Sequence, residues 1–126
     1  MAKQIVSTPE APAAVGPYSQ AVKANGLVFC SGQIPLSPET GELAGDSITA
    51  QTEQCLKNLS AVLAAAGTST AEIVKVTAYL VDMGDFPEFN SVYERFFDDE
   101  PPARATVGVA ALPKGARVEV ECVALA

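Results

Sequence analysis

The chain has 126 residues, of which 48% are apolar and 18% charged. Acidic residues outnumber basic ones 15 to 8, which gives a net charge of −7, and no cluster of Lys or Arg interrupts this balance. Most non-specific affinity for nucleic acid comes from Lys and Arg side chains that neutralise its phosphates, so this negative charge disfavours a nucleic-acid partner. The chain contains no histidine, which excludes the usual general base and every Ser-His or Cys-His nucleophile.

The length predicts a single domain over residues 1–126. Its three cysteines, Cys30, Cys55 and Cys122, are far apart and odd in number, so they favour a reducing cytoplasm, and we expect all three to be buried. No basic start precedes an apolar run and no stretch approaches about 18 apolar residues, so we expect neither a signal peptide nor a membrane span. The high apolar fraction indicates that part of the surface is buried between identical subunits.

The first half of the chain predicts three strands and a helix. Residues 3–7 favour a short strand, and Asn25-Gly26 between residues 21–24 and 27–30 predicts a type I′ hairpin. Gly32, in the returning strand, indicates either a bulge or a close approach to the backbone. From Ile48 the apolar period becomes helical, with Asp46 or Ser47 as N-cap and Gly67 as the stop. The expected buried face is Ile48, Cys55, Leu56, Leu59, Val62, Leu63 and Ala66, and Gln51, Glu53, Lys57 and Asn58 are expected largely opposite it.

The second half predicts a strand, a helix and two closing strands. Residues 73–81 form a strand whose expected core face is Val74, Val76, Ala78 and Leu80. Residues 85–88 have the pattern of a capping box, and the helix they start is expected to end near Phe97, before Pro101-Pro102. The order β-ββ-α-β-α-β-β therefore predicts an α+β domain: a mixed sheet with two helices on one face.

The two closing strands, within residues 101–109 and 117–123, each carry charge. Arg104, Thr106 and Gly108 share one face of the first, and Glu119 and Glu121 share one face of the second. If the strands are neighbours, these groups form either a site that binds a carboxylate and handles water or a cross-strand salt bridge, which is the commoner arrangement. The spacing leaves both open.

Four separated motifs bear on this choice. They are Gly16-Pro17-Tyr18-Ser19-Gln20-Ala21, Ser31-Gly32-Gln33-Ile34-Pro35, Pro102-Ala103-Arg104, and Leu112-Pro113-Lys114-Gly115 with Val118-Glu119-Val120-Glu121. In order and spacing, over essentially the whole chain, they resemble the RidA (YjgF-type) reactive intermediate deaminases. The resemblance implies a chorismate-mutase-like fold and a homotrimer with three sites between subunits. It also implies hydrolysis of enamine/imine intermediates, such as 2-aminoacrylate and 2-aminocrotonate, to 2-keto acids and ammonia.

The resemblance assigns roles residue by residue. Arg104 matches the anchor for the substrate carboxylate, Glu119 the acid that activates water, and Tyr18 the site tyrosine. The pocket-lining and substrate-binding positions are Gly32, Asn90, Ser31 and Thr106. Thr106 stands where some members carry a cysteine, which argues against a cysteine nucleophile. No cofactor or metal is required, because a protonated imine carbon is already electrophilic.

Two alternatives to the deaminase remain. The Arg104 pocket would also suit a module that binds 2-keto acids or amino acids without turning them over. An endoribonuclease or translation inhibitor is disfavoured by the charge of −7 and the absence of histidine. For the deaminase and for the binding module, the expected partners are small 2-imino or 2-keto carboxylates. The sequence does not fix which site residues share a subunit, nor whether Glu121 faces the site.

Overall fold

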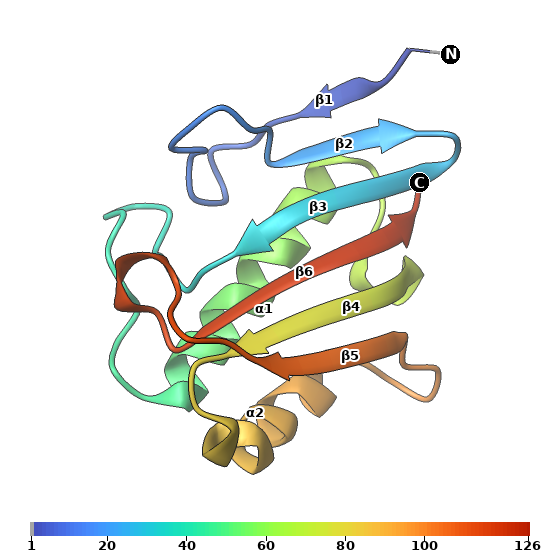
Figure 1. Ribbon diagram of the computed structural model, residues 1–126. Coiled ribbons are helices and arrows are strands. Elements are labelled where there is room, and N and C mark those ends of the chain that lie inside the picture. Colours follow the sequence, from blue (N-terminus) through green and yellow to red (C-terminus); the bar gives the residue numbers. More distant parts are fainter. Residues whose placement is uncertain (1) are drawn as a thin grey trace.

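The computed structural model describes residues 2–126, which form one six-stranded sheet with two α-helices on the same face (Figure 1). The elements are β1 (Gln4–Val6), β2 (Ala21–Ala24), β3 (Leu27–Gln33), α1 (Ile48–Ala65), β4 (Ile73–Leu80), α2 (Phe86–Tyr93), β5 (Ala103–Gly108) and β6 (Val118–Leu125). The strands lie in the order β1-β2-β3-β6-β4-β5, and only β4 and β5 pair in parallel. The predicted element order, the mixed sheet and the α+β class are confirmed.

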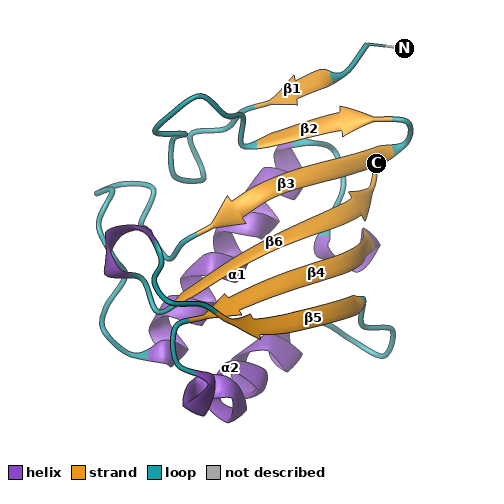
Figure 2. Cartoon of the chain, viewed as in Figure 1, coloured by secondary structure: helices purple, strands orange, loops and turns teal. Residues whose placement is uncertain are grey.

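The long loops gather at one end of the sheet. Figure 2 shows that the β1–β2, β3–α1 and β5–β6 loops all lie where β3 ends and β6 begins. No helix within residues 2–126 is long and apolar enough to cross a membrane.

The core lies between the sheet and the helices. Val118, Val120, Cys122 and Ala124 alternate along β6 and are buried against the helices, so Glu119 and Glu121 point to the opposite, open face. The predicted apolar face of α1 is buried throughout, and all three cysteines are buried. Ser47 is the N-cap of α1, since its hydroxyl oxygen accepts a hydrogen bond from the Ala50 N–H at 3.0 Å.

Two polar residues of α1 were expected on its outer face and are instead buried. Gln51 donates to the Gly45 carbonyl at 2.9 Å and accepts from the Arg117 N–H at 2.8 Å. Asn58 donates to the carbonyls of Ile34 and Leu36 at 3.3 and 3.0 Å. Both amides are tolerated inside because they satisfy loop backbone that would otherwise lack partners.

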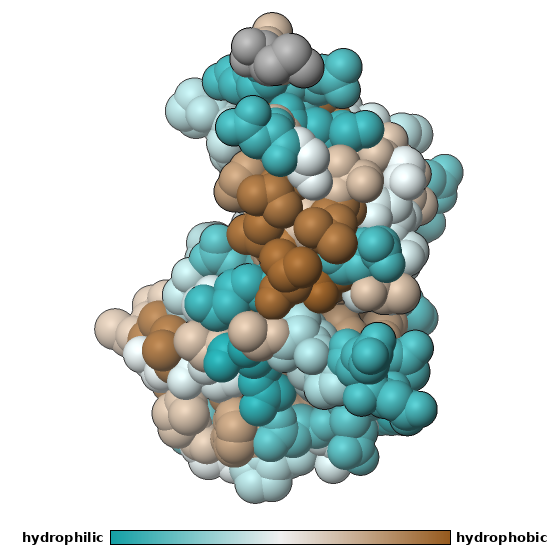
Figure 3. Space-filling model, turned by 90° about the vertical axis from the view of Figure 1, so that its right-hand side faces the viewer, coloured by the Kyte–Doolittle hydropathy of each residue, from teal (hydrophilic) through white to brown (hydrophobic). Residues whose placement is uncertain are grey.

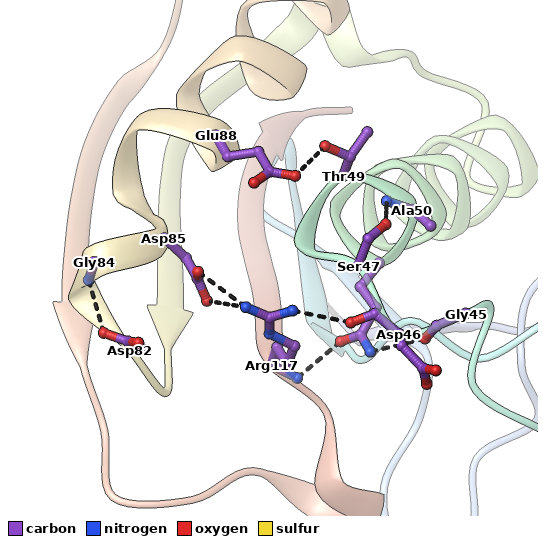
Figure 4. A network of polar contacts seen from close by, with 11 residues as sticks. Gly45, Asp46, Ser47, Thr49, Ala50, Asp82, Gly84, Asp85, Glu88 and Arg117 are labelled. Carbon is purple, nitrogen blue, oxygen red and sulfur yellow. Dashed lines mark hydrogen bonds and ion pairs between the residues drawn. The ribbon is translucent and has the colours of Figure 1, made fainter.

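The predicted capping box at the start of α2 is wrong, although the helix does begin at Phe86. The Asp85 carboxylate accepts two hydrogen bonds of 2.9 Å from Arg117 instead of capping its own helix. Glu88 accepts from the Thr49 hydroxyl. Arg117 also donates to the Asp46 carbonyl at 2.9 Å, so one arginine ties α2 to the start of α1 (Figure 4).

The predicted core face of β4 holds for three of its four residues. Val76, Ala78 and Leu80 are fully buried, whereas Val74 is 42% exposed and Ile73 takes its place inside. The reason is a shift in the β4–β6 register between Ile73 and Lys75, which turns the first residues of the strand over.

Candidate active site

One group of predicted site residues lines a pocket of about 460 Å³ at the loop end of the sheet. Tyr18, Ser31, Gly32 and Glu119 all border it. The rest of its wall is largely apolar and includes Val15, Ile34, Leu36 and Pro113. The pocket therefore places a carboxylate and a phenol beside a surface suited to an aliphatic group.

Gly32 makes room for the Glu119 carboxyl group. The register of β3 with β6 shifts between Cys30 and Gln33, so the backbone bulges at Gly32. A Cβ atom added there would lie 2.9 Å from Glu119 Cδ and nearer still to Oε2. Both functions that the sequence allowed for this glycine, a bulge and a close approach, are therefore present.

The Tyr18 loop is fastened to the same bulge. The Ser31 hydroxyl donates to the Ser19 carbonyl at 2.5 Å, and the Ser31 N–H donates to the Gln20 carbonyl at 2.9 Å. The buried Gln20 side chain closes the loop by accepting from the Thr8 N–H and donating to the Pro12 carbonyl. Tyr18 itself is half-exposed and borders the pocket.

The environment of Glu119 favours its neutral form more than water does. Burial raises the pKa of Glu119, and the negative charge of Glu121 raises it further. Glu121 is on the same open face and accepts a hydrogen bond from the Tyr79 hydroxyl, which raises the pKa of Tyr79 to about 12. Glu121 thus acts on Glu119 through its charge and does not line the pocket.

Arg104 belongs to a second group, between β5 and α2. Its Nη1 donates to Asn90 Oδ1 at 2.9 Å, and its guanidinium carbon lies 4.7 Å from the centroid of the Tyr93 ring. This arginine borders a separate pocket of about 430 Å³, with Asn90, Tyr93, Glu94, Pro101 and Pro102. Thr106 follows on the same face of β5, and its buried hydroxyl has no hydrogen-bond partner within residues 2–126.

The two groups lie on opposite faces of the sheet. Arg104 is opposite the buried Val76 and so points to the helix face, whereas Glu119 is opposite Tyr79 on the open face. The two strands are not neighbours, because α2 returns the chain parallel to β4, and β4 then lies between β5 and β6. No ion pair joins Arg104 to Glu119 or Glu121 in the part of the chain that is described.

Tyr93 and Phe89 belong to the apolar face of α2, and no sequence motif marks either as a site residue. Both are buried, yet their rings also contact Arg104. The apolar pattern of a helix does not distinguish a ring that packs in the core from a ring that contacts Arg104, since Arg104 is on a strand. Within residues 2–126 no group of three His, Cys, Asp or Glu side chains is placed to hold a metal ion.

The fold and the two groups together define a class of protein: an α+β domain with an arginine in one pocket and a glutamate in another. The chain belongs to the Endoribonuclease L-PSP family, which is the family of the RidA (YjgF-type) proteins and whose pattern matches residues 8–126. The resemblance carried by the four motifs is confirmed.

Individual relatives agree over most of the chain. It is 51% identical, over 122 residues, to the Reactive Intermediate Deaminase A, chloroplastic, of Arabidopsis thaliana; the match covers 97% of this chain but 65% of that protein. It is 45% identical over 123 residues to the 2-iminobutanoate/2-iminopropanoate deaminase of Mus musculus, covering 98% and 91% of the two chains. The crystal structure of the Rid-family protein YyfA of Yersinia pestis superposes with a TM-score of 0.97 at 47% identity, covering 99% and 100%.

Proposed function

We propose that this chain hydrolyses 2-imino acids, the unstable products typified by 2-aminoacrylate and 2-aminocrotonate, to 2-keto acids and ammonia. The observation that carries the proposal is the Arg104 guanidinium, which is held by Asn90 and opens into a pocket. A guanidinium offers paired donors to a carboxylate, at about 1.5–3 kcal/mol per charged hydrogen bond. Relatives named as deaminases of such compounds support it.

The chemistry needs a held substrate and a positioned water. Arg104 anchors the substrate carboxylate, with Asn90 and Thr106 beside it, while Glu119 takes a proton from the water that adds to the iminium carbon. Glu119 then returns that proton to the nitrogen of the carbinolamine, the carbon–nitrogen bond breaks to release ammonia, and the hydroxyl group gives its proton to Glu119 as the carbonyl forms. Tyr18 hydrogen-bonds the substrate, and Gly32 and Ser31 shape the pocket around it.

The same proposal includes a homotrimer of chorismate-mutase-like single domains, residues 1–126, with each site shared between two subunits. The placement of Arg104 and Glu119 on opposite faces of one sheet supports a site that a second copy completes. The open face supports such contacts. Ile5, Val22, Phe29 and Val123 are aligned across β1, β2, β3 and β6. Figure 3, which faces the strand ends on the right-hand side of Figure 1, shows that apolar side chains also gather there.

A competition assay tests the activity. A pyridoxal-phosphate dehydratase generates 2-aminocrotonate while semicarbazide traps the imine, and the trapped adduct is measured with and without this protein. The wild type should lower the adduct, and Arg104→Ala should not. Arg95→Ala is the matched control, because Arg95 is exposed and, within residues 2–126, its side chain donates only to the Ser91 carbonyl of α2. Equal adduct with the wild type and Arg104→Ala refutes the proposal.

One observation favours the non-catalytic alternative as a second candidate. The Arg104 group is complete in one copy of the chain, whereas the base lies on the other face. A single copy therefore has the parts needed to bind a 2-keto acid without turning it over. Binding of 2-oxobutanoate by a protein that leaves the trapped adduct unchanged would support this candidate.

A further inference from the structure

We propose that Tyr93 is the positioning residue of Arg104: its ring face holds the guanidinium so that the remaining N–H groups point at an incoming carboxylate. Three rings surround the cation, with the guanidinium carbon 4.7 Å from the Tyr93 centroid, 5.5 Å from Phe86 and 5.7 Å from Phe89. A cation within about 6 Å of a ring face is attracted by its quadrupole. The role rests on the proposed function, in which Arg104 anchors the substrate.

The rings and the acceptor come from one helix. Asn90 and Tyr93 are three residues apart on α2 and therefore project from the same side. Asn90 takes one N–H of the guanidinium and the Tyr93 ring covers part of the cation, which fixes both its direction and its rotation. Arg104 needs this support because β5 is an edge strand, with β4 its only paired neighbour.

The orientation of the Tyr93 ring is itself fixed. The ring is almost fully buried, 5.5 Å from Phe89 and 4.6 Å from Phe97 between centroids. Its hydroxyl makes no hydrogen bond within residues 2–126. Burial raises the pKa of Tyr93 and outweighs the opposing effect of Arg104, so the phenol stays neutral and does not form an ion pair with the guanidinium. The ring face, and not the oxygen, therefore acts on Arg104.

The first test separates the ring from the hydroxyl. In calorimetric titration with 2-oxobutanoate, Tyr93→Phe should bind as the wild type does, and Tyr93→Leu should bind about tenfold more weakly, as expected for loss of a partly desolvated cation–π contact. In the competition assay the same loss should fall on KM more than on kcat. Phe97→Leu is the matched control, because it removes a ring from the same cluster that touches Tyr93 but does not surround the cation.

A second series of variants keeps the shape of the ring at position 93 and changes only its quadrupole. Fluorinated phenylalanines placed at position 93 weaken the quadrupole stepwise while preserving packing, so affinity for 2-oxobutanoate should fall with each added fluorine. This series remains decisive if Tyr93→Leu fails to fold. Affinity that does not change along the series, or a Tyr93→Leu defect no larger than that of Phe97→Leu, overturns the role of Tyr93.

Arg104→Ala in the same titration distinguishes the two levels of failure. If it binds 2-oxobutanoate as tightly as the wild type, Arg104 is not the anchor and the proposed function falls. If binding depends on Arg104 but not on the ring at position 93, the proposed function stands and only the positioning role is wrong.

Discussion

At the scale of single residues, Gly32 is the position where one atom decides the geometry of the site. A Cβ there would overlap the Glu119 carboxyl group, which sits at the end of a flexible side chain and so would move away. Gly32→Ala should keep the fold but lower kcat about a hundredfold, since a base displaced by about 1 Å loses its line to the water. The competition assay measures this. Gly84→Ala is the control, because its Cβ meets the Asp82 carboxylate instead; equal losses in both variants would refute the explanation.

Also at this scale, burial and the neighbouring Glu121 carboxylate together set the pH at which Glu119 would act as the proposed base. A general base is active when deprotonated, so activity should fall as the pH drops through the raised pKa of Glu119. Glu121→Gln removes one of the two causes of that rise, and the acidic limb of kcat/KM should move to lower pH. Burial, the larger cause, remains, so the move is partial. Glu88→Gln makes the same charge change at an exposed site and should leave the profile in place; a limb that moves to higher pH in Glu121→Gln contradicts this account.

At the scale of elements, Gln51 joins α1 to two loops: the one before α1, through Gly45, and the one before β6, through Arg117. Gln51→Leu leaves the Arg117 N–H and the Gly45 carbonyl without their partner, and should lower the free energy of unfolding by about 2–3 kcal/mol. Urea denaturation followed by circular dichroism measures the loss. Lys57→Ala, on the exposed side of the same helix, should change stability by less than about 0.5 kcal/mol. A loss of that small size in Gln51→Leu would show that water replaces the amide.

Elements set by local sequence were predictable, and contacts between distant residues were not. The apolar stripe of α1 and the Asn25-Gly26 turn follow from spacing of a few residues, and both are present. Gln51 and Arg117 are 66 residues apart, so nothing near Gln51 shows that it is buried. The candidate site residues were identified from motifs, but their separation onto two faces depends on the register with β4, which pairs Arg104 with Val76 and Glu119 with Tyr79 and which neither β5 nor β6 encodes alone.

At the scale of the whole molecule, the sheet separates the two halves of the proposed site. The helix face carries Arg104, which donates a hydrogen bond to Asn90, and the open face carries Glu119, whose pKa is raised, and the apolar residues aligned across β1, β2, β3 and β6. No rotation of a side chain brings groups on opposite faces of one sheet together. If the glutamate is not the base, Glu119→Gln alone stays active. If it is the base and two copies of the chain share each site, two inactive variants restore activity to each other in mixed assemblies.

Arg104→Ala and Glu119→Gln should each be inactive alone and recover activity when refolded together. If each site takes Arg104 from one copy and Glu119 from another, random mixing at equal amounts leaves about a quarter of the sites with both wild-type residues. The specific activity should then reach about a quarter of that of the wild type. The control mixes wild type with the double variant. If sites are shared between copies, this mixture again has about a quarter of the wild-type activity. If each site is built within one copy, the control mixture has about half of that activity and the mixture of the two single variants has none. That second outcome would require a chain rearrangement that brings the two faces together, and would rule out the shared site.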